Sequence, residues 1–375
     1  MSPADQRATN AMTTSPFQRI TIIGVGLIGG SLGLAVKRKF PDVWVTGYDK
    51  PGVLQRAIKR GAIDSSAWSI ESALAAPDLV ILATPLAATL ELLPAIGRRV
   101  SARVVVTDVG SVKSTIVQRS RSCFPHRNFI GGHPMAGVEL SGIEAAHPLL
   151  FENAVYVLTP PPKTPHHALH RLSHFLHLLG ARVLVLDAST HDSVASAVSH
   201  LPQLAAVAMM NTVGKKHRGS GANLQLAAGG FRDLTRIASS RFDVWQDVLE
   251  FNRKNIVHAL DLYIGELLRY KLLVAKGGSK LRKDFVQSRL LRSRIPKSMK
   301  GFLHPLSEVL VFLEDRPGTL ALLTTTLGKA KLNIKDMELV KVREGTGGTF
   351  RLSFGTREEA EKAAKLLKKK GFSPS

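Results

Sequence analysis

The chain has few of the features that mark secreted, membrane-spanning or disulfide-stabilised proteins. Its 375 residues include a single cysteine, Cys123, so no disulfide can form within the chain and a reducing compartment is expected. No apolar stretch is expected to be long and uninterrupted enough to span a bilayer, and residues 1–16 lack the apolar core of a signal peptide. We therefore expect a cytoplasmic protein, away from membranes, with a disordered leader over residues 1–16 in which Met12 is an alternative start.

Acidic residues are also scarce, with 29 Asp and Glu against 51 Lys and Arg and a net charge of +22. An excess of this kind is common in proteins that bind nucleic acids. Much of it lies in residues 269–300, where aromatic residues that could stack on bases are sparse and no zinc-finger or helix-turn-helix signature occurs. The favoured interpretation is a solvated helix and linker in a protein that handles anionic substrates, with a nucleic-acid-binding regulator as the distant alternative.

The strongest local pattern is a glycine-rich turn near the start of the chain. A short apolar run, residues 20–23, is followed by three glycines at G-x-G-x-x-G spacing and then by a helical pattern. In a dinucleotide site the first glycine permits a tight turn, the second lets the backbone approach the pyrophosphate, and the third allows close packing of helix on strand. Partial positive charge at the start of the helix then holds the phosphates. The expected cofactor contacts are Gly24, Gly26, Leu27, Ile28 and Gly29.

A second apolar run, residues 43–48, ends in Asp49, at about the distance where an acidic side chain accepts hydrogen bonds from a ribose diol. The carboxylate of Asp49 would repel a 2′-phosphate, so NAD is the expected cofactor, although the neighbouring Lys50 leaves some tolerance for NADP open. The alternative interpretation is that Asp49 only caps a turn before Pro51.

The order of strand and helix patterns divides the chain. Alternating patterns over residues 17–188 predict a Rossmann-like, doubly wound α/β sheet, and long helical patterns predict an all-helical domain over residues 189–276. A basic linker is expected over residues 277–306. The order βαββαβ over residues 307–375 then indicates a small ferredoxin-like module, with Thr356 and Glu359 as a capping box. The further strands expected in the first domain are residues 79–83, 104–108, 129–131, 155–158 and 183–186, and the second domain is expected to contain a long helix over residues 242–270.

The helical domain begins with a pattern that carries polar side chains on one face. Thr190 is expected to cap this helix, and Ser196, His200 and Gln203 fall at helical spacing along it, with a kink near Pro202. By analogy, a helical domain that follows a dinucleotide domain carries part of the substrate site and the dimer contact.

The loop after the strand at residues 104–108 lies where doubly wound sheets place ligands. In it Ser111 can form hydrogen bonds near a nicotinamide, and Lys113 can attract an anion. The alternative is that Ser111 or Ser114 caps the following helix. At the same edge of the sheet, Thr84 and Pro85 are further expected cofactor contacts.

His133 is the first choice for a catalytic base. Gly132 and Gly137 flank it and would let a ligand come close, while Pro134 stiffens the backbone that presents the imidazole. A histidine titrates near neutral pH, so it can take a proton from a hydroxyl group as hydride leaves the same carbon. A histidine in a turn is more often inert, but the flanking glycines and the position after a strand favour the base.

The segment 231–236 offers the guanidinium groups of Arg232 and Arg236 for bidentate binding of a substrate carboxylate. Asp233 and Arg236 are alternatively placed for an ordinary i,i+3 ion pair on a helix. Cysteine and histidine do not cluster at metal-ligand spacing, and hydride transfer needs no metal, so none is expected.

Five motifs in one order resemble the prephenate dehydrogenase family of tyrosine biosynthesis: residues 24–29, 107–113, 131–137, 199–202 and 231–236. Residues 307–372 resemble an ACT regulatory domain. The resemblance implies NAD-dependent oxidative decarboxylation of prephenate to 4-hydroxyphenylpyruvate by a homodimer. It also implies that His133 and Ser111 are catalytic, that Arg236 and His200 bind substrate, and that Glu139 forms a gate to the site.

One position departs from the prephenate-specific pattern that we expect. Gln203 stands where a second histidine would follow His200, and an uncharged amide there is a poorer partner for the pyruvyl side chain of prephenate and suits the amino group of arogenate. Arogenate or dual specificity, as in a cyclohexadienyl dehydrogenase, is therefore the first alternative, and another hydride-transfer enzyme acting on a different hydroxy acid or an imine is the second. The ACT resemblance implies feedback inhibition by tyrosine, with Gly318 and Asn333 as expected effector contacts.

Overall fold

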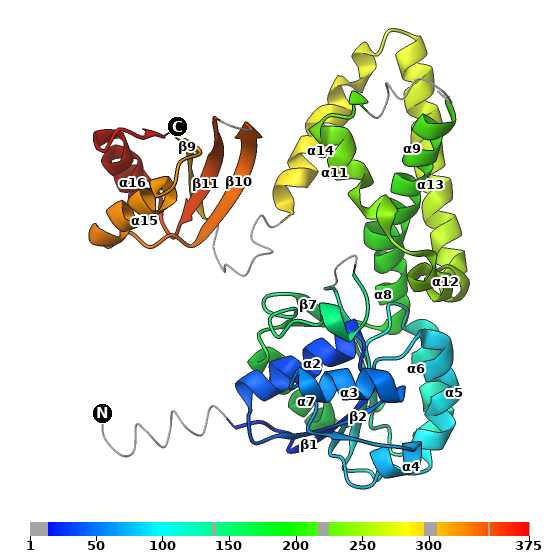
Figure 1. Cartoon of the computed structure of the whole chain (residues 1–375). Helices are drawn as coiled ribbons and strands as arrows, with labels where there is room; N and C mark the ends of the chain where they lie inside the picture. The colour runs from blue at the N-terminus through cyan, green and yellow to red at the C-terminus, as the bar shows by residue number, and fades with distance from the viewer. Residues whose placement is uncertain (1–13, 137–139, 217–224, 296–305, 344–345, 375) are drawn as a thin grey trace. The chain divides into compact units, whose positions relative to one another are not determined.

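The computed structural model describes residues 14–136, 140–216, 225–295, 306–343 and 346–374. The chain divides into two compact units, Met1–Leu281 and Arg282–Ser375, and each is described by itself (Figure 1). Most of the expected leader lies outside the described residues. Its last residues do not fit a disordered leader, because Ser15 is buried and its hydroxyl group donates to the carbonyl oxygen of Phe17.

An eight-stranded sheet with the order β3-β2-β1-β4-β5-β6-β7-β8 organises the first unit. All neighbouring strands are parallel except β6 and β7, which are antiparallel. The order of the first six strands is that of the doubly wound dinucleotide fold, so this prediction is confirmed. The strands are β1 Arg19–Ile23, β2 Trp44–Tyr48, β3 Ser65–Ser66, β4 Leu79–Leu82, β5 Val105–Asp108, β6 Phe129–Pro134, β7 Val155–Thr159 and β8 Arg182–Val185.

Helices cover both faces of this sheet and bury an apolar core on each. One core joins the sheet to α2 (Leu27–Lys39), α3 (Pro51–Lys59) and α7 (His166–Leu178), where Phe17 and Phe175 meet edge to face. The other core lies under α5 (Leu86–Gly97) and α6 (Ser114–Cys123) and continues into the helical domain. The short helices are α4 (Ile70–Ala73) and the 3-10 helix η1 (Ile143–Ala145).

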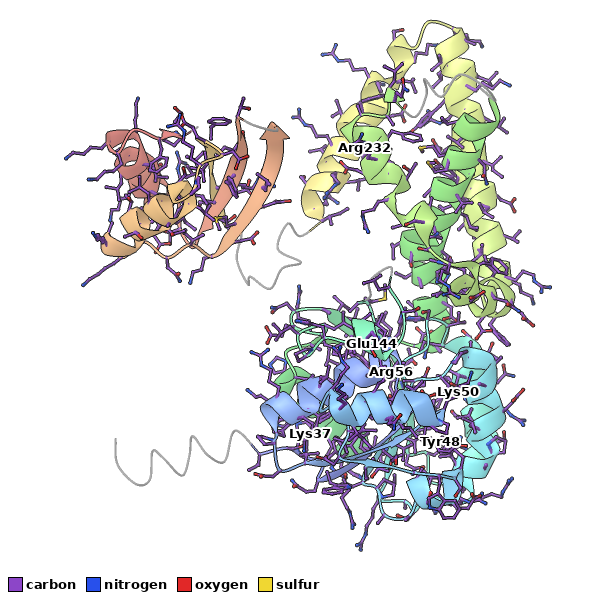
Figure 2. All side chains as sticks on the ribbon, viewed as in Figure 1. Lys37, Tyr48, Lys50, Arg56, Glu144 and Arg232 are labelled. Carbon is purple, nitrogen blue, oxygen red and sulfur yellow. The ribbon has the colours of Figure 1, made fainter. Side chains whose placement is uncertain are left out.

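Two arginines of the α3 region fix η1 against the nucleotide-binding half of the sheet. Arg56 and Arg60 both pair with Glu144, at 3.2 and 3.5 Å, and Figure 2 shows Arg56 and Glu144 next to each other. Because these side chains are largely exposed, the pairs contribute little to stability.

The second domain is helical, as predicted. It starts with one continuous helix built from α8 (Ala188–Ala195), the π-helix η2 (Ser196–His200) and α9 (Leu201–Lys216). Thr190 does not cap this helix, because Asp187 is the N-cap and its carboxylate accepts a hydrogen bond from the Thr190 backbone N–H. The remaining elements are α11 (Gly229–Thr235), the 3-10 helix η3 (Arg236–Ser239), α12 (Phe242–Phe251), α13 (Arg253–Ala275) and the 3-10 helix η4 (Ser279–Leu281).

Pro202 lies just after a wide turn of the helix, and the expected kink of the helix axis stays a prediction. Proline has no N–H to donate and its ring collides with the carbonyl group four residues earlier. The helix widens into η2, which ends two residues before Pro202, and π-turns of this kind are frequent at functional sites.

The long helix expected over residues 242–270 is two helices. Asn252, with φ of −112° and ψ of 20°, separates α12 from α13. It is buried, and its side chain forms hydrogen bonds with the α8–η2 helix. The apolar pattern continues on both sides of Asn252, so periodicity alone gave no sign of the break.

The helix that spans residues 188–214 is long and apolar enough, by length and composition, to cross a membrane, which the sequence analysis did not expect. Such a helix is weak evidence for a membrane span, because core helices pass the same test. This one also carries His191, Asp192 and His200, all of them buried and hydrogen-bonded to other parts of the first unit.

The second unit holds an antiparallel sheet with the order β10-β11-β9-β12. Its order along the chain is βαββαβ, which confirms the predicted ferredoxin-like arrangement, and Thr356 and Glu359 form the expected capping box. The expected linker contains a helix, α14, whose sequence is rich in good helix formers. The elements are α14 Arg282–Arg294, β9 Ser307–Leu313, α15 Thr319–Lys329, β10 Asp336–Arg343, β11 Gly347–Phe354, α16 Arg357–Lys369 and β12 Ser373–Pro374.

Candidate active site

The glycine turn between β1 and α2 has the geometry that a bound dinucleotide requires. Gly24 has φ of +92°, and a Cβ there would lie 2.6 Å from the carbonyl carbon of Ala83 and 2.8 Å from the Thr84 nitrogen. A Cβ on Gly29 would lie 2.0 Å from the Gly24 oxygen, so helix and strand pack too closely for any side chain. A Cβ on Gly26 would meet no atom within 4 Å, which leaves the open approach that a pyrophosphate needs.

The start of α2 also suits a phosphate. Gly26 is its N-cap and no side chain caps it, so the first N–H groups of Leu27 and Ile28 point out of the helix with its positive dipole end. Thr84 and Pro85 follow β4 beside Gly24, and Pro85 is the N-cap of α5. These residues therefore fit a dinucleotide at this edge of the sheet.

Asp49 lies at the end of β2, next to the glycine turn. Its Oδ2 accepts a hydrogen bond from the Val25 N–H at 2.7 Å, and its Oδ1 accepts one from the Lys50 N–H at 2.6 Å. The side chains of the flanking residues Tyr48 and Lys50 lie at the same end of the strand (Figure 2). The carboxylate thus braces the glycine turn, and its contact with the ribose of a bound dinucleotide stays a prediction.

A cavity of about 350 Å³ lies where the carboxyl ends of β5 and β6 meet the helical domain. Ser111 and His133 line it from the sheet, and Ser199 and His200 line it from the π-helix η2. The cavity therefore brings together both expected catalytic residues and one expected substrate-binding residue. The rest of its lining is Pro134, Met135, Ala136, Val244, Trp245 and Val248.

The expectation that Lys113 attracts an anion from solution is wrong. Its side chain is fully buried and pairs with Asp108, and its Nζ also donates to the Gly132 carbonyl oxygen at 2.8 Å. Burial lowers the pKa of Lys113, and the Asp108 carboxylate opposes that shift. The residue is part of the framework beneath His133.

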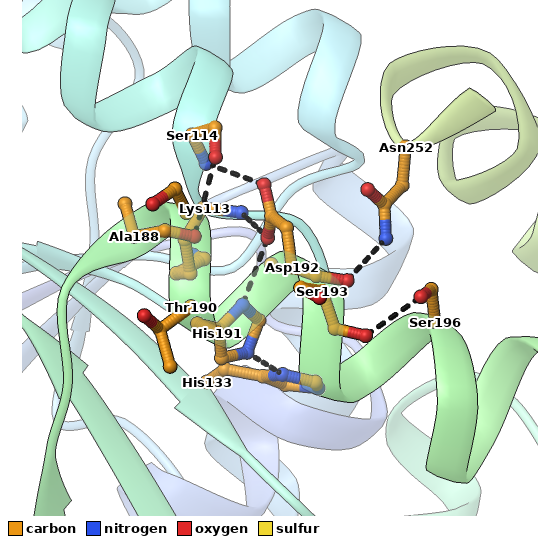
Figure 3. A network of polar contacts seen from close by, with 12 residues as sticks. Lys113, Ser114, His133, Ala188, Thr190, His191, Asp192, Ser193, Ser196 and Asn252 are labelled. Carbon is orange, nitrogen blue, oxygen red and sulfur yellow. Dashed lines mark hydrogen bonds and ion pairs between the residues drawn. The ribbon is translucent and has the colours of Figure 1, made fainter. Parts of the chain in front are cut away.

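Neither Ser111 nor Ser114 caps α6. The cap comes from the helical domain, where the Asp192 carboxylate accepts hydrogen bonds from the Lys113 N–H at 2.7 Å and from the Ser114 N–H at 2.8 Å (Figure 3). Since Asp192 also lies 2.8 Å from the Nδ1 of His191, one carboxylate joins the two domains at the base of the cavity.

His133 contacts a second histidine that the sequence analysis missed. The Nδ1 of His133 lies 2.8 Å from the Nε2 of His191 (Figure 3). Burial, followed by the charges of His191 and Lys113, lowers the pKa of His133 well below its ordinary value. His133 is therefore neutral at neutral pH, as a proton acceptor must be.

His200 is also buried and neutral. Burial lowers its pKa to about 4, although the Asp192 carboxylate opposes the shift. The His200 ring meets Trp245 edge to face, and its Nδ1 lies 3.2 Å from the Nδ2 of Asn252. Asn252, like His191, had no motif around it that could have revealed its part in the site.

Arg236 and Gln203 do not line this cavity. Gln203 is buried, and its Nε2 donates to the Ile237 carbonyl oxygen at 2.9 Å. This bond holds η3, the short helix that begins with the exposed Arg236, against α9. Glu139 lies outside the described residues.

The expected effector contacts lie in the second unit. Gly318 has φ of +86° and caps α15, and Asn333 is exposed between α15 and β10. A cavity of about 230 Å³ lies beside Gly318, with Asp315, Arg316 and Thr319 in its wall.

Two protein families match this chain. The family described as prephenate dehydrogenase, nucleotide-binding domain, matches residues 32–185, and the one described as prephenate dehydrogenase, dimerization domain, matches residues 187–287. Together they cover the sheet from β2 onward and the helical domain, and so include every residue that lines the cavity, whereas β1 and the glycine turn precede the first match.

Individual relatives agree with these families. A prephenate dehydrogenase from Bacillus subtilis is 33% identical over 352 residues, which are 93% of this chain and 95% of the relative. A cyclohexadienyl dehydrogenase from Zymomonas mobilis is 32% identical over 281 residues, 74% of this chain and 95% of the relative. The crystal structure of Aquifex aeolicus prephenate dehydrogenase in complex with hydroxyphenyl propionate and NAD+ has a TM-score of 0.70 at 31% identity, and covers 74% of this chain and 98% of its own.

Proposed function

Because this chain belongs to the prephenate dehydrogenase family, we propose that it oxidises and decarboxylates prephenate to 4-hydroxyphenylpyruvate, with NAD as the cofactor. The observation that carries the proposal is the single cavity that Ser111, His133 and His200 share at the carboxyl edge of the sheet. The glycine turn lies at the same edge, two strands away from β5 in the order β1-β4-β5.

His133 and Ser111 have different roles in the proposed oxidation. NAD, when bound, accepts the hydride that leaves C4 of the substrate. The imidazole of His133 takes the proton of the C4 hydroxyl group, and Ser111 orients that group by hydrogen bonding. The C1–carboxylate bond then breaks and carbon dioxide leaves. The electron pair of that bond enters the ring and ends on the C4 oxygen, which takes the proton back from His133 to give an aromatic phenol. Holding the reacting carbon in place is the main contribution of the cavity.

Binding of the substrate carboxylates is assigned to Arg236, with Glu139 as a gate to the site. An arginine provides the bidentate donors that a carboxylate requires. Arg236 reaches its place through η3, which Gln203 anchors to α9, so we infer that Gln203 acts on substrate binding through Arg236 as well as by its own amide.

Arogenate, alone or together with prephenate, is the second candidate substrate. Gln203 favours it, because an amide tolerates the amino group of arogenate. The test is one assay in which the purified protein meets NAD or NADP with prephenate or arogenate. Turnover of prephenate at the higher kcat/KM supports the first proposal, preference for arogenate selects the second, and turnover of neither rejects both.

We also propose that the enzyme is a cytoplasmic homodimer, and that residues 307–375 form an ACT domain through which tyrosine inhibits it. The ferredoxin-like strand order and the cavity beside Gly318 support the regulatory domain, and the match to a dimerization domain supports the dimer. Tyrosine should lower turnover in the full chain and not in a variant that lacks residues 302–375. Activity that tyrosine leaves unchanged in both proteins would reject the regulatory proposal.

A further inference from the structure

We propose that His191, backed by Asp192, is a positioning residue that holds His133 in the less common of its two neutral tautomers, while Asn252 holds His200 in the opposite one. The two histidines would then offer opposite hydrogen-bonding groups to the same cavity. The catalytic consequence rests on the proposed function, whereas the tautomers follow from the contacts alone.

Asp192 is buried at the N-terminus of α6. Two backbone N–H groups, of Lys113 and Ser114, donate to its two carboxylate oxygens at 2.7 and 2.8 Å. Burial alone would raise the pKa of Asp192, but hydrogen bonds from His191, Ser114 and Lys113 outweigh burial and lower it. Asp192 is therefore an anion, and an ionised carboxylate can only accept hydrogen bonds.

The direction of the next two bonds follows from that anion. The Nδ1 of His191, 2.8 Å from Asp192 Oδ1, must carry a hydrogen and donate it. The proposal includes a neutral His191, whose imidazole has one N–H and whose Nε2 is then an acceptor. The Nδ1 of His133, 2.8 Å from that Nε2, must then be the donor. This leaves the Nε2 of His133 with its lone pair, as the nitrogen that can take a proton in the cavity.

This tautomer is not the one that His133 would adopt by itself. A neutral histidine side chain in water carries its hydrogen mostly on Nε2, and a hydrogen there would make His133 a donor toward the substrate hydroxyl group instead of a base. The chain His133–His191–Asp192 has the logic of a catalytic triad, in which a buried carboxylate selects the tautomer of the base. Here one additional imidazole lies between the carboxylate and the base (Figure 3).

Asn252 determines the tautomer of the second histidine, His200. Its Nδ2 lies 2.9 Å from the Asp192 backbone carbonyl oxygen, so the amide must place its NH2 group there. Its Oδ1 accepts a hydrogen bond from Asn255 at 2.7 Å, which fixes the same orientation. The second hydrogen of the NH2 group points to the Nδ1 of His200 at 3.2 Å. That Nδ1 is then an acceptor, and the hydrogen of His200 lies on Nε2.

The cavity consequently offers a lone pair from His133 and an N–H from His200. A substrate that carries a hydroxyl group at one end and a carbonyl or carboxylate oxygen at the other fits this pair in one orientation only. The hydroxyl group donates to His133, and the oxygen acceptor faces His200. A reversed molecule would place its carbonyl or carboxylate oxygen against the lone pair of His133, so two buried acceptors would face each other with no hydrogen between them.

Nitrogen-15 spectra of histidine-labelled full-length protein at neutral pH read the tautomers directly, without substrate or cofactor. Signals are assigned with the variants His133→Gln and His200→Gln. We expect Nδ1–H for His133 and Nε2–H for His200 in the wild-type protein. Nε2–H for His133, Nδ1–H for His200, or a doubly protonated His191 would overturn the proposal.

The variant His191→Phe keeps a ring in place but can neither accept from His133 nor donate to Asp192. We expect His133 to switch to Nε2–H in this variant, while His200 remains Nε2–H and shows that the site is still folded. Asp192→Asn should cause the same switch, because an amide can donate to His191. Asp187→Asn is the matched control, since it makes the same carboxylate-to-amide change at the cap of α8 and leaves the histidine chain intact. A His133 tautomer unchanged in His191→Phe would overturn the proposal.

Kinetics supply the second readout. In the triad the corresponding Asp-to-Asn change lowers kcat by about 10⁴, and we expect His191→Phe to lower kcat by roughly 10²–10⁴ while KM for NAD changes less than about threefold. His191→Gln should recover at least about tenfold of the lost kcat, because its amide oxygen can accept from His133 near the position of the lost nitrogen. A kcat of His191→Phe within about threefold of the wild-type value would overturn the proposal. If wild-type protein oxidises neither candidate substrate, the proposed function fails, and the spectra still decide the tautomers.

Discussion

Asp108 and Lys113 form an ion pair that is completely buried beneath the cavity, with exposed side-chain fractions of 1% and 0%. The Asp108 carboxylate also accepts hydrogen bonds from the Gly110 N–H at 2.8 Å and from the Gly132 N–H at 3.1 Å. Lys113 donates to the carbonyl oxygen of the same Gly132. The pair thus fixes the end of β5, the start of α6 and the strand that carries His133.

The first prediction concerns the stability of this framework. Lys113→Met should lower the free energy of unfolding by about 3–5 kcal/mol, because it leaves the Asp108 charge buried without its partner. Urea unfolding followed by circular dichroism measures the loss. The double variant Lys113→Met with Asp108→Asn should recover part of it, since the uncompensated charge is then gone. A double variant that is no more stable than the single one would mean that packing, and not charge, accounts for the effect.

The second prediction concerns acid sensitivity. The pKa of His200 is about 4 in the folded protein, below its ordinary value of 6.5, so the unfolded chain binds more protons between these two values. Stability contributed by neutral His200 is therefore complete above about pH 6.5 and is lost as the pH falls toward 4, by roughly 2 kcal/mol. Unfolding free energies of the wild-type protein and His200→Gln, measured from pH 7 to pH 4, should converge in this window. Parallel curves for the two proteins would contradict the expectation.

The third prediction separates cofactor binding from folding within one turn. Gly26→Ala places its Cβ in open space, so stability should change little while the Kd for NAD rises about tenfold, or ~1.4 kcal/mol. Gly29→Ala places its Cβ 2.0 Å from the Gly24 oxygen, and should destabilise the fold by about 1–3 kcal/mol or more. Urea unfolding and NAD titration by fluorescence measure both effects. Equal losses of stability in the two variants would contradict the assignment of cofactor binding to Gly26 and of folding to Gly29.

The fourth prediction tests the anchoring of η3. Gln203→Leu removes the hydrogen bond to the Ile237 carbonyl oxygen, so the segment that carries Arg236 should lose its fixed position. We expect KM for the substrate to rise about tenfold with kcat changed less than about threefold, as for a loss of uniform binding. Thr212→Val is the matched control, because it removes a hydrogen bond within α9 that does not reach η3. An unchanged KM in Gln203→Leu would separate Gln203 from substrate binding.

Most of the strands and helices could be predicted from sequence patterns, because these patterns reflect local geometry. The apolar runs before Gly24 and Asp49, the glycine spacing and the capping box at Thr356 each depend on neighbours within a few residues. The same holds for the ferredoxin-like order of the second unit. Two-residue β3 was missed because it is too short for a periodic pattern, and the reversed β7 because strand direction depends on the connection.

The site was predictable only in part, since its supporting contacts link distant segments. Asp192 caps a helix that begins 78 residues earlier in the chain. Asn252 donates a hydrogen bond to the backbone carbonyl oxygen of Asp192, 60 residues before it. Neither pairing leaves a mark in local sequence. Lys113 was misread for a related reason: a lysine in a loop is usually exposed, and only the fold reveals that Asp108 compensates its charge.

The π-helix before Pro202 makes the length of its segment functionally significant. Each residue of a regular helix rotates the chain by about 100° around the helix axis. The wide turn at Ser196–His200 contains one extra residue, and the helix after it does not turn by the further rotation that this residue would add to a regular helix. Deleting a single residue there would let the helix close into ordinary turns. Either the half that contacts the sheet or the half that holds η3 would then face the wrong way, so a deletion of one residue would change how His133 and Arg236 lie relative to each other.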